Sequence, residues 1–152
     1  PFVRDTQPLW KSRLMFTPLF ARPWGPAVWM RYFSTLYPSR QPADFAAYCA
    51  ALRDKLNDPA RLSALRRMMT SSKASSEARL SRVNTPVLVL MGSKDPDFPS
   101  PEAEARLVAE RLHGSYHMIE GAGHYPHAEM PEITAPLLLS FLQGLKEAVY
   151  AA

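Results

Sequence analysis

The sequence contains a single cysteine, Cys49, among its 152 residues. A disulfide within the chain is therefore excluded, which fits a reducing compartment, and we expect a cytoplasmic protein. No apolar run approaches the about 20 residues that a helix needs to cross a bilayer, and no signal-peptide pattern is present. The pattern Gly-x-Ser-x-Gly, which places a nucleophilic serine on a sharp turn, occurs nowhere in the sequence.

The composition is that of an ordinary globular domain. Hydrophobic residues make up 47% of the sequence and charged residues 21%, which argues against disorder. The net charge of +4 includes a basic cluster made of Arg61, Arg66, Arg67, Lys73, Arg79 and Arg82. These basic residues alternate with core-type residues, as is typical of a solvated helix face, so we expect neither a nucleic-acid nor a membrane partner.

Helical spacing dominates the first half, in which no segment is typical of a strand. An aromatic-rich helix is predicted over residues 27–37, and a second follows Pro42, with apolar residues at positions 45, 49, 52 and 56. Asp58-Pro59 suits the N-cap and first turn of a third helix. The polar run 70–76 is expected to be a loop or a helix end.

The second half changes to continuous apolar runs. Residues 86–91 form such a run, which is typical of a strand covered on both faces of a parallel sheet. A helix with Ser100 as N-cap and Gly114 at its C-terminal stop should follow, and then a strand over residues 116–119. Strand, helix, strand and a final helix require a parallel sheet with right-handed crossovers.

The final helix should begin at Pro131 or Thr134, and Pro136 is tolerable only in its first turn. Two strands alone cannot form a stable parallel sheet, because both faces need cover and one edge needs another strand. We therefore expect the chain to be part of a larger structure.

An acid and a histidine follow the two predicted strands. Asp95 comes after a short turn that contains Gly92, and His124 comes after the loop 121–123. In open α/β sheets, ligands bind beyond the carboxyl ends of the strands, so we expect these side chains to meet there. A carboxylate on the imidazole Nδ1–H fixes the tautomer, and the other nitrogen can then accept a proton from a nucleophile. Either residue alone would more commonly be a turn former or a surface residue.

These two segments resemble the acid and histidine loops of the α/β-hydrolase family. The first contains Gly-Ser-Lys-Asp-Pro-Asp-Phe-Pro, and the second Gly-Ala-Gly-His-Tyr-Pro-His-Ala-Glu-Met-Pro-Glu. The resemblance covers residues 83–142 and implies that Asp95 is the triad acid and His124 the general base. The helices before it, residues 7–81, are similar only in kind, and residues 1–5 resemble the segment that leaves the strand before the family's cap.

The resemblance implies a partial α/β fold, with a helical cap segment over residues 1–82 and a βαβα core part over residues 83–152. The family's nucleophile and oxyanion loop belong to the first half, which is absent. We therefore expect a C-terminal part of a hydrolase that acts on an ester or related small apolar organic substrate. We expect it to need no cofactor, to have the N-terminal half of the same hydrolase as its partner and to be inactive alone.

Other residues offer alternative sites. Asp97 is an alternative acid and Asp5 a more remote one, while His127 and Glu129 are expected to hold the histidine loop. A metal site built from Asp95, Asp97, His124 and His127 uses suitable ligand types, but the family resemblance explains the same residues, and we expect no metal. A dinucleotide fingerprint at residues 121–126 fails because Pro126 stands where the third glycine belongs.

Aromatic and methionine residues predict an apolar substrate pocket. The residues proposed for it are Trp10, Trp29, Phe33 and Tyr125, although each alone is more typical of packing. A second hypothesis is a non-catalytic interaction module, or a cleavage product, that binds another polypeptide through an open sheet edge. A homodimer or a domain swap would cover that edge equally well.

Overall fold

The computed structural model describes residues 9–150 and, within them, the side chains of residue 11 and residues 14–147. The first half is helical, as predicted, and contains α1 (Leu9–Leu19), α2 (Gly25–Thr35), α3 (Phe45–Leu56), α4 (Pro59–Met69), α5 (Ala74–Glu77) and the 3-10 helix η1 (Leu80–Arg82). The second half contains β1 (Leu88–Gly92), α6 (Pro101–Arg111), β2 (Ser115–Ile119), α7 (Pro126–Glu129) and α8 (Pro131–Tyr150).

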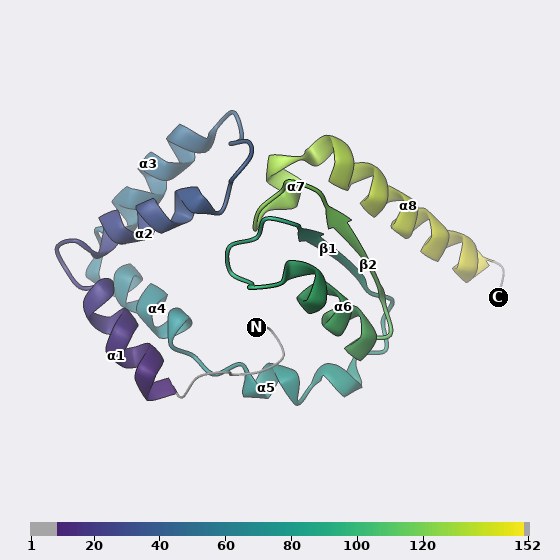
Figure 1. Cartoon of the computed structure of the whole chain (residues 1–152), viewed down its shortest axis with the longest axis horizontal. Helices are drawn as coiled ribbons and strands as arrows, with labels where there is room; N and C mark the ends of the chain where they lie inside the picture. Colours follow the sequence, from purple (N-terminus) through teal and green to yellow (C-terminus); the bar gives the residue numbers. More distant parts are fainter. Residues whose placement is uncertain (1–8, 151–152) are drawn as a thin grey trace.

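The two strands form one parallel sheet between two helices. β1 pairs with β2 from Leu88↔Ser115 to Gly92↔Ile119, so both strands end at the same level. Helix α6 makes the crossover and packs on one face, while α8 lies over the other face (Figure 1). The predicted α/β class, with two parallel strands and their helices, is confirmed.

The loops after the two strands are joined by backbone hydrogen bonds. The Ser93 backbone N–H donates to the Ile119 carbonyl oxygen at 3.0 Å, and the Lys94 N–H donates to that of Ala122 at 2.9 Å. A Cβ atom at Gly92 would overlap the carbonyl oxygens of Ala122 and Gly123. Only glycine allows this approach, which places the two loops side by side.

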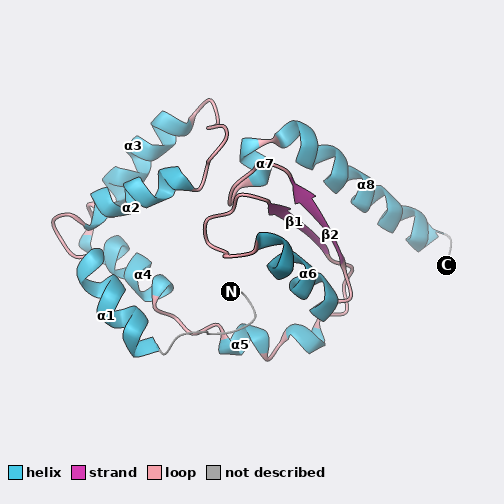
Figure 2. Cartoon of the chain, in the orientation of Figure 1, coloured by secondary structure: helices cyan, strands magenta, loops and turns pink. Residues whose placement is uncertain are grey.

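Helices α1–α4 form a curved layer that reaches the sheet through α5 and η1 (Figure 2). Met30, Phe33 and Leu36 form its buried cluster, and Phe33 stacks on Phe45 with ring centroids 5.9 Å apart. Tyr125 of the histidine loop packs against the same cluster. The apolar side of α2 therefore packs against the segment that contains His124.

Most helix boundaries match the prediction. The Asp58 side chain accepts a hydrogen bond from the Ala60 N–H at 2.8 Å and caps α4, as expected. Ser100 precedes α6, but its side chain makes no capping hydrogen bond. Helix α8 begins at Pro131. Among the described residues, no helix combines the length and apolarity needed to cross a membrane.

Two local predictions were wrong, and one short helix was missed. The left-handed residue that ends α6 is His113, with φ 51°, and not Gly114. The Gly114 N–H donates to the Ala109 carbonyl at 2.9 Å, which is the hydrogen bond of a Schellman cap. Pro136 lies beyond the first turn of α8, inside the helix. The one-turn helix α7, which follows the histidine loop, was not predicted.

Gly92→Ala should destabilise the protein, because the new Cβ would meet two carbonyl oxygens that belong to the histidine loop. Overpacking of this kind costs about 1–3 kcal/mol in the free energy of unfolding. Gly144→Ala is the matched control: a Cβ there meets nothing within 4 Å, and alanine is the better helix former by about 1 kcal/mol. Urea unfolding of both variants would measure the difference, and equal stabilities would contradict the prediction.

Candidate active site

Asp95 and His124 meet beyond the carboxyl ends of β1 and β2. The Asp95 residue is 4% exposed, and its Oδ2 lies 2.9 Å from the His124 Nδ1. The other oxygen, Oδ1, accepts the Asp97 backbone N–H at 3.0 Å, which fixes the carboxylate in the turn. Because an ionised carboxylate can only accept, the pair places the proton of a neutral imidazole on Nδ1. The second ring nitrogen is then a proton acceptor, as a general base requires.

Asp97, the alternative acid, lies at the same imidazole nitrogen but farther away. Its Oδ2 is 3.6 Å from the His124 Nδ1, which is beyond a normal hydrogen bond. Its Oδ1 accepts a hydrogen bond from the Tyr32 hydroxyl of α2. Burial and this bond both raise the pKa of Tyr32, so its hydroxyl stays protonated and remains a donor. Of the two carboxylates, Asp95 is therefore the one positioned to orient the histidine.

The same three residues have the side-chain types of a metal site. One ligand atom from each of Asp95, Asp97 and His124 lies within 4.8 Å of the others. His127, the fourth ligand considered from the sequence, is not part of this cluster, and its exposed ring lies beside Tyr125 at 6.1 Å. The Nδ1 atom is already hydrogen-bonded to Asp95, so a metal ion held by this nitrogen would have to displace that bond.

Tyr125 connects the histidine to the aromatic rings of Phe33 and Tyr37. Its ring meets the His124 ring edge-on at 4.9 Å and stacks on Tyr37 at 5.3 Å. Burial raises the pKa of Tyr125 and raises that of Tyr37 to about 12, so both hydroxyls remain neutral near pH 7. The Tyr125 ring is therefore an uncharged aromatic neighbour of the imidazole, beside the two carboxylates at Nδ1.

The other residues predicted for the pocket occupy different environments. Trp29 is half-buried on α2 and packs against Tyr32 with ring centroids 5.3 Å apart. Phe33 is 4% exposed and lies inside the aromatic cluster. The Trp10 side chain and Asp5 lie outside the described residues, as does the predicted strand exit at residues 1–5.

Glu129 binds the histidine loop to the chain that follows α2. It is fully buried, and its Oε1 accepts the backbone N–H groups of Ser39 at 2.6 Å and Arg40 at 3.0 Å. Its Oε2 accepts the Gly123 N–H at 2.7 Å, one residue before His124. The prediction that Glu129 holds the histidine loop is confirmed. The sequence did not predict that the backbone N–H groups of Ser39 and Arg40 would donate to the same carboxylate.

Further backbone hydrogen bonds strengthen this connection. The His124 N–H donates to the Leu36 carbonyl at 3.0 Å, and the Ser39 hydroxyl donates to the Gly121 carbonyl at 2.5 Å. The Arg40 Nε donates to the Glu129 carbonyl at 2.8 Å. The backbone of the histidine is therefore held by the end of α2, while its side chain is held by the loop after β1.

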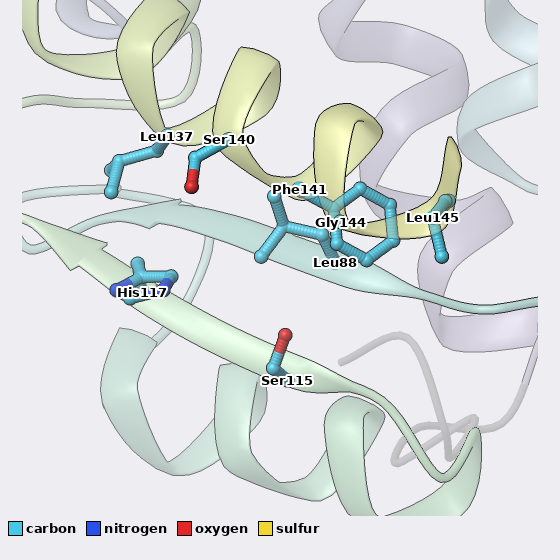
Figure 3. Close-up of a pocket in the computed structure, with 8 residues that line it drawn as sticks. All are labelled: Leu88, Ser115, His117, Leu137, Ser140, Phe141, Gly144 and Leu145. Atoms are coloured by element: carbon cyan, nitrogen blue, oxygen red, sulfur yellow. The ribbon is translucent and has the colours of Figure 1, made fainter. Parts of the chain in front are cut away.

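The remaining histidines lie away from this cluster. His117 lines a cavity of about 410 Å³ between the sheet and α8, together with Leu88 and Ser115 (Figure 3). Leu88 and Ser115 begin the two strands and His117 lies in the middle of β2, so this cavity lies along the face of the sheet beside α8 and not at the carboxyl ends, where Asp95 is. His113 is exposed at the end of α6. Neither residue is part of the candidate active site.

Comparison with known proteins identifies the family and the fold of this chain. A family model described as "Alpha/beta hydrolase family" matches residues 2–137. The chain is similar in fold to a solved structure of Est816, described as an N-acyl homoserine lactone degrading enzyme, with a TM-score of 0.56 and 19% identity. The match covers 83% of this chain and 50% of that one, so this chain spans about half of that enzyme's length. No curated protein matches the sequence.

Glu129→Gln should cost about 2–4 kcal/mol in the free energy of unfolding. The remaining side-chain oxygen of the glutamine can still accept the N–H groups of Ser39 and Arg40. The new amide group is a donor, however, and would face the Gly123 N–H, which is also a donor. Glu132→Gln is the control, because Glu132 pairs with Arg40 at the surface and should cost much less. Urea unfolding gives both values. A Glu129→Gln variant as stable as Glu132→Gln would show that the buried carboxylate is not needed.

Proposed function

Because this chain belongs to the α/β-hydrolase family, we propose that it provides the acid and the histidine of a catalytic triad. The reaction is the hydrolysis of an ester or a related small organic substrate. The proposal rests on one observation, the 2.9 Å hydrogen bond between buried Asp95 and the His124 Nδ1 at the carboxyl ends of the parallel strands. In this proposal residues 1–82 are the cap and residues 83–152 are part of the core.

The two residues have distinct roles in this mechanism. The His124 Nε2 accepts the proton of the nucleophile and returns it to the leaving group. Asp95 holds the imidazole in the required tautomer and stabilises the imidazolium that forms. The nucleophile and the oxyanion donors come from the N-terminal half of the hydrolase. A serine there would form an acyl-enzyme, and an aspartate an alkyl-enzyme.

The surroundings of the imidazole favour an apolar substrate. Trp29, Tyr37 and Tyr125 contribute rings near the site, and the Tyr37 hydroxyl is uncharged at neutral pH. Est816 is described as degrading N-acyl homoserine lactones, and a lactone is a cyclic ester. A substrate panel should therefore combine p-nitrophenyl esters of increasing acyl length with an acyl lactone.

The chain alone should show no ester hydrolysis above background, and His124→Ala should leave that background unchanged. When the chain is combined with the N-terminal half that contains the nucleophile, activity should appear. Asp95→Asn or His124→Ala should then lower kcat by about 10³–10⁴-fold, as expected for the loss of a triad member. Release of p-nitrophenol measures both experiments.

Two outcomes would contradict the proposal. Hydrolysis by the isolated chain that His124→Ala abolishes would show that no second half is needed. Activity of the combined halves that survives both substitutions would remove Asp95 and His124 from the mechanism. His117→Ala is the control variant, because His117 lines the cavity between the sheet and α8, away from Asp95 and His124, and its loss should leave kcat unchanged.

The interaction-module hypothesis is favoured by a different observation. Leu138, Leu139 and Leu142 of α8 are 47%, 58% and 51% exposed, and the sheet of the described residues has only two strands. Apolar residues left open on a helix are typical of a surface that binds another polypeptide.

If α8 binds a second polypeptide, the purified chain should form a dimer or retain a partner. Multi-angle light scattering after size exclusion would measure its mass, and Leu138→Lys/Leu142→Lys should shift the species towards the 17.1 kDa monomer. Arg111→Glu, on α6, is a surface control that should leave the mass unchanged. A concentrated sample that stays monomeric would count against this hypothesis.

A further inference from the structure

Two carboxylates of one turn lie at the same imidazole nitrogen. The Asp95 Oδ2 is 2.9 Å from the His124 Nδ1, and the Asp97 Oδ2 is 3.6 Å from it. The Asp97 backbone N–H also donates to the Asp95 carboxylate, so the two acids are held in one compact turn. A small approach of Asp97 would give it a full hydrogen bond to the histidine. A contact with the Asp97 side chain is therefore needed to keep its carboxylate away from the imidazole.

Tyr32 is hydrogen-bonded to the Asp97 side chain. Its hydroxyl donates to the Asp97 Oδ1, across 65 positions of the sequence and from a different layer of the molecule. The Tyr32 ring is fixed in turn by Trp29, one turn earlier on α2. Burial and Asp97 raise the pKa of the Tyr32 hydroxyl, so the donor persists across the neutral range. The second acid is therefore hydrogen-bonded to the helices and not to the imidazole.

We propose that Tyr32 is a positioning residue that determines which of the two acids pairs with His124. By holding Asp97 to α2, it leaves the histidine Nδ1–H to Asp95 alone. This inference rests on the proposed function in one respect, since the choice of acid matters for catalysis only if His124 is the general base. The choice itself is a property of the folded chain and needs no nucleophile or substrate.

The proposal predicts a specific response of the imidazole tautomer. In Asp95→Asn, the asparagine amide can donate to Nδ1, which moves the ring proton to Nε2. If Tyr32 holds Asp97 away, this variant should show mainly the Nε2–H form. Adding Tyr32→Phe frees Asp97 to accept from Nδ1–H, and a charge-assisted bond should favour the Nδ1–H form about tenfold over the single variant.

The test is ¹⁵N NMR of the His124 ring in the full chain, since the two tautomers give different nitrogen shifts. The Nδ1–H form should return in Asp95→Asn/Tyr32→Phe and should be lost again when Asp97→Asn is added. Tyr48→Phe in the Asp95→Asn background is the matched control, because it removes a hydroxyl from an exposed ring of α3. A double variant with the same tautomer ratio as Asp95→Asn alone would overturn the proposal.

A second measurement applies if Asp95→Asn does not fold. In the otherwise unchanged chain, Tyr32→Phe should shift the His124 Nδ1–H proton resonance, and Asp97→Asn added to it should reverse the shift. An unshifted resonance would overturn the proposal. Because no turnover is measured, the outcome is separate from that of the hydrolysis assay: either can fail while the other holds.

Discussion

The buried carboxylate of Glu129 is the constraint on which the site depends. It accepts three backbone N–H groups, two from residues 90 and 89 positions before it in the sequence and one from Gly123, 6 positions before it. A buried carboxylate is costly unless its oxygens are satisfied, so the site is stable only when both segments are in place. Gly123, one of its donors, directly precedes His124. The position of the histidine is therefore set by residues 36–40 together with its own loop.

The sheet supplies the second half of this arrangement. β1 and β2 end at the same level, and the Gly92 backbone lies against the loop that follows β2. The acid then needs only a short turn to reach the imidazole, and its second oxygen is used within that turn. Backbone contacts thus place the pair, and the aromatic packing of Tyr125 closes one side of it.

Much of this geometry could be predicted from the sequence. The apolar run 86–91 and the shorter run 116–119 indicated parallel strands, and parallel strands bring Asp95 and His124 to one edge because of their topology. The contacts from α2 could not be predicted in the same way. Leu36 contributes a carbonyl oxygen that every residue possesses, and Tyr32 had the pattern of an ordinary aromatic core residue. The left-handed backbone of His113 could not be predicted, because glycine is the usual residue at such a position and Gly114 is the next residue.

The hydrogen bond from the His124 backbone N–H to the Leu36 carbonyl also limits which helices of this chain could be replaced by those of another hydrolase. The end of α2 and residues 36–40 support the histidine loop, whereas α3 and α4 contribute none of its hydrogen bonds described above. A chimaera that takes its helices from another hydrolase should therefore have its first junction after Arg40. A graft that begins earlier must bring its own acceptor and its own donors for Glu129.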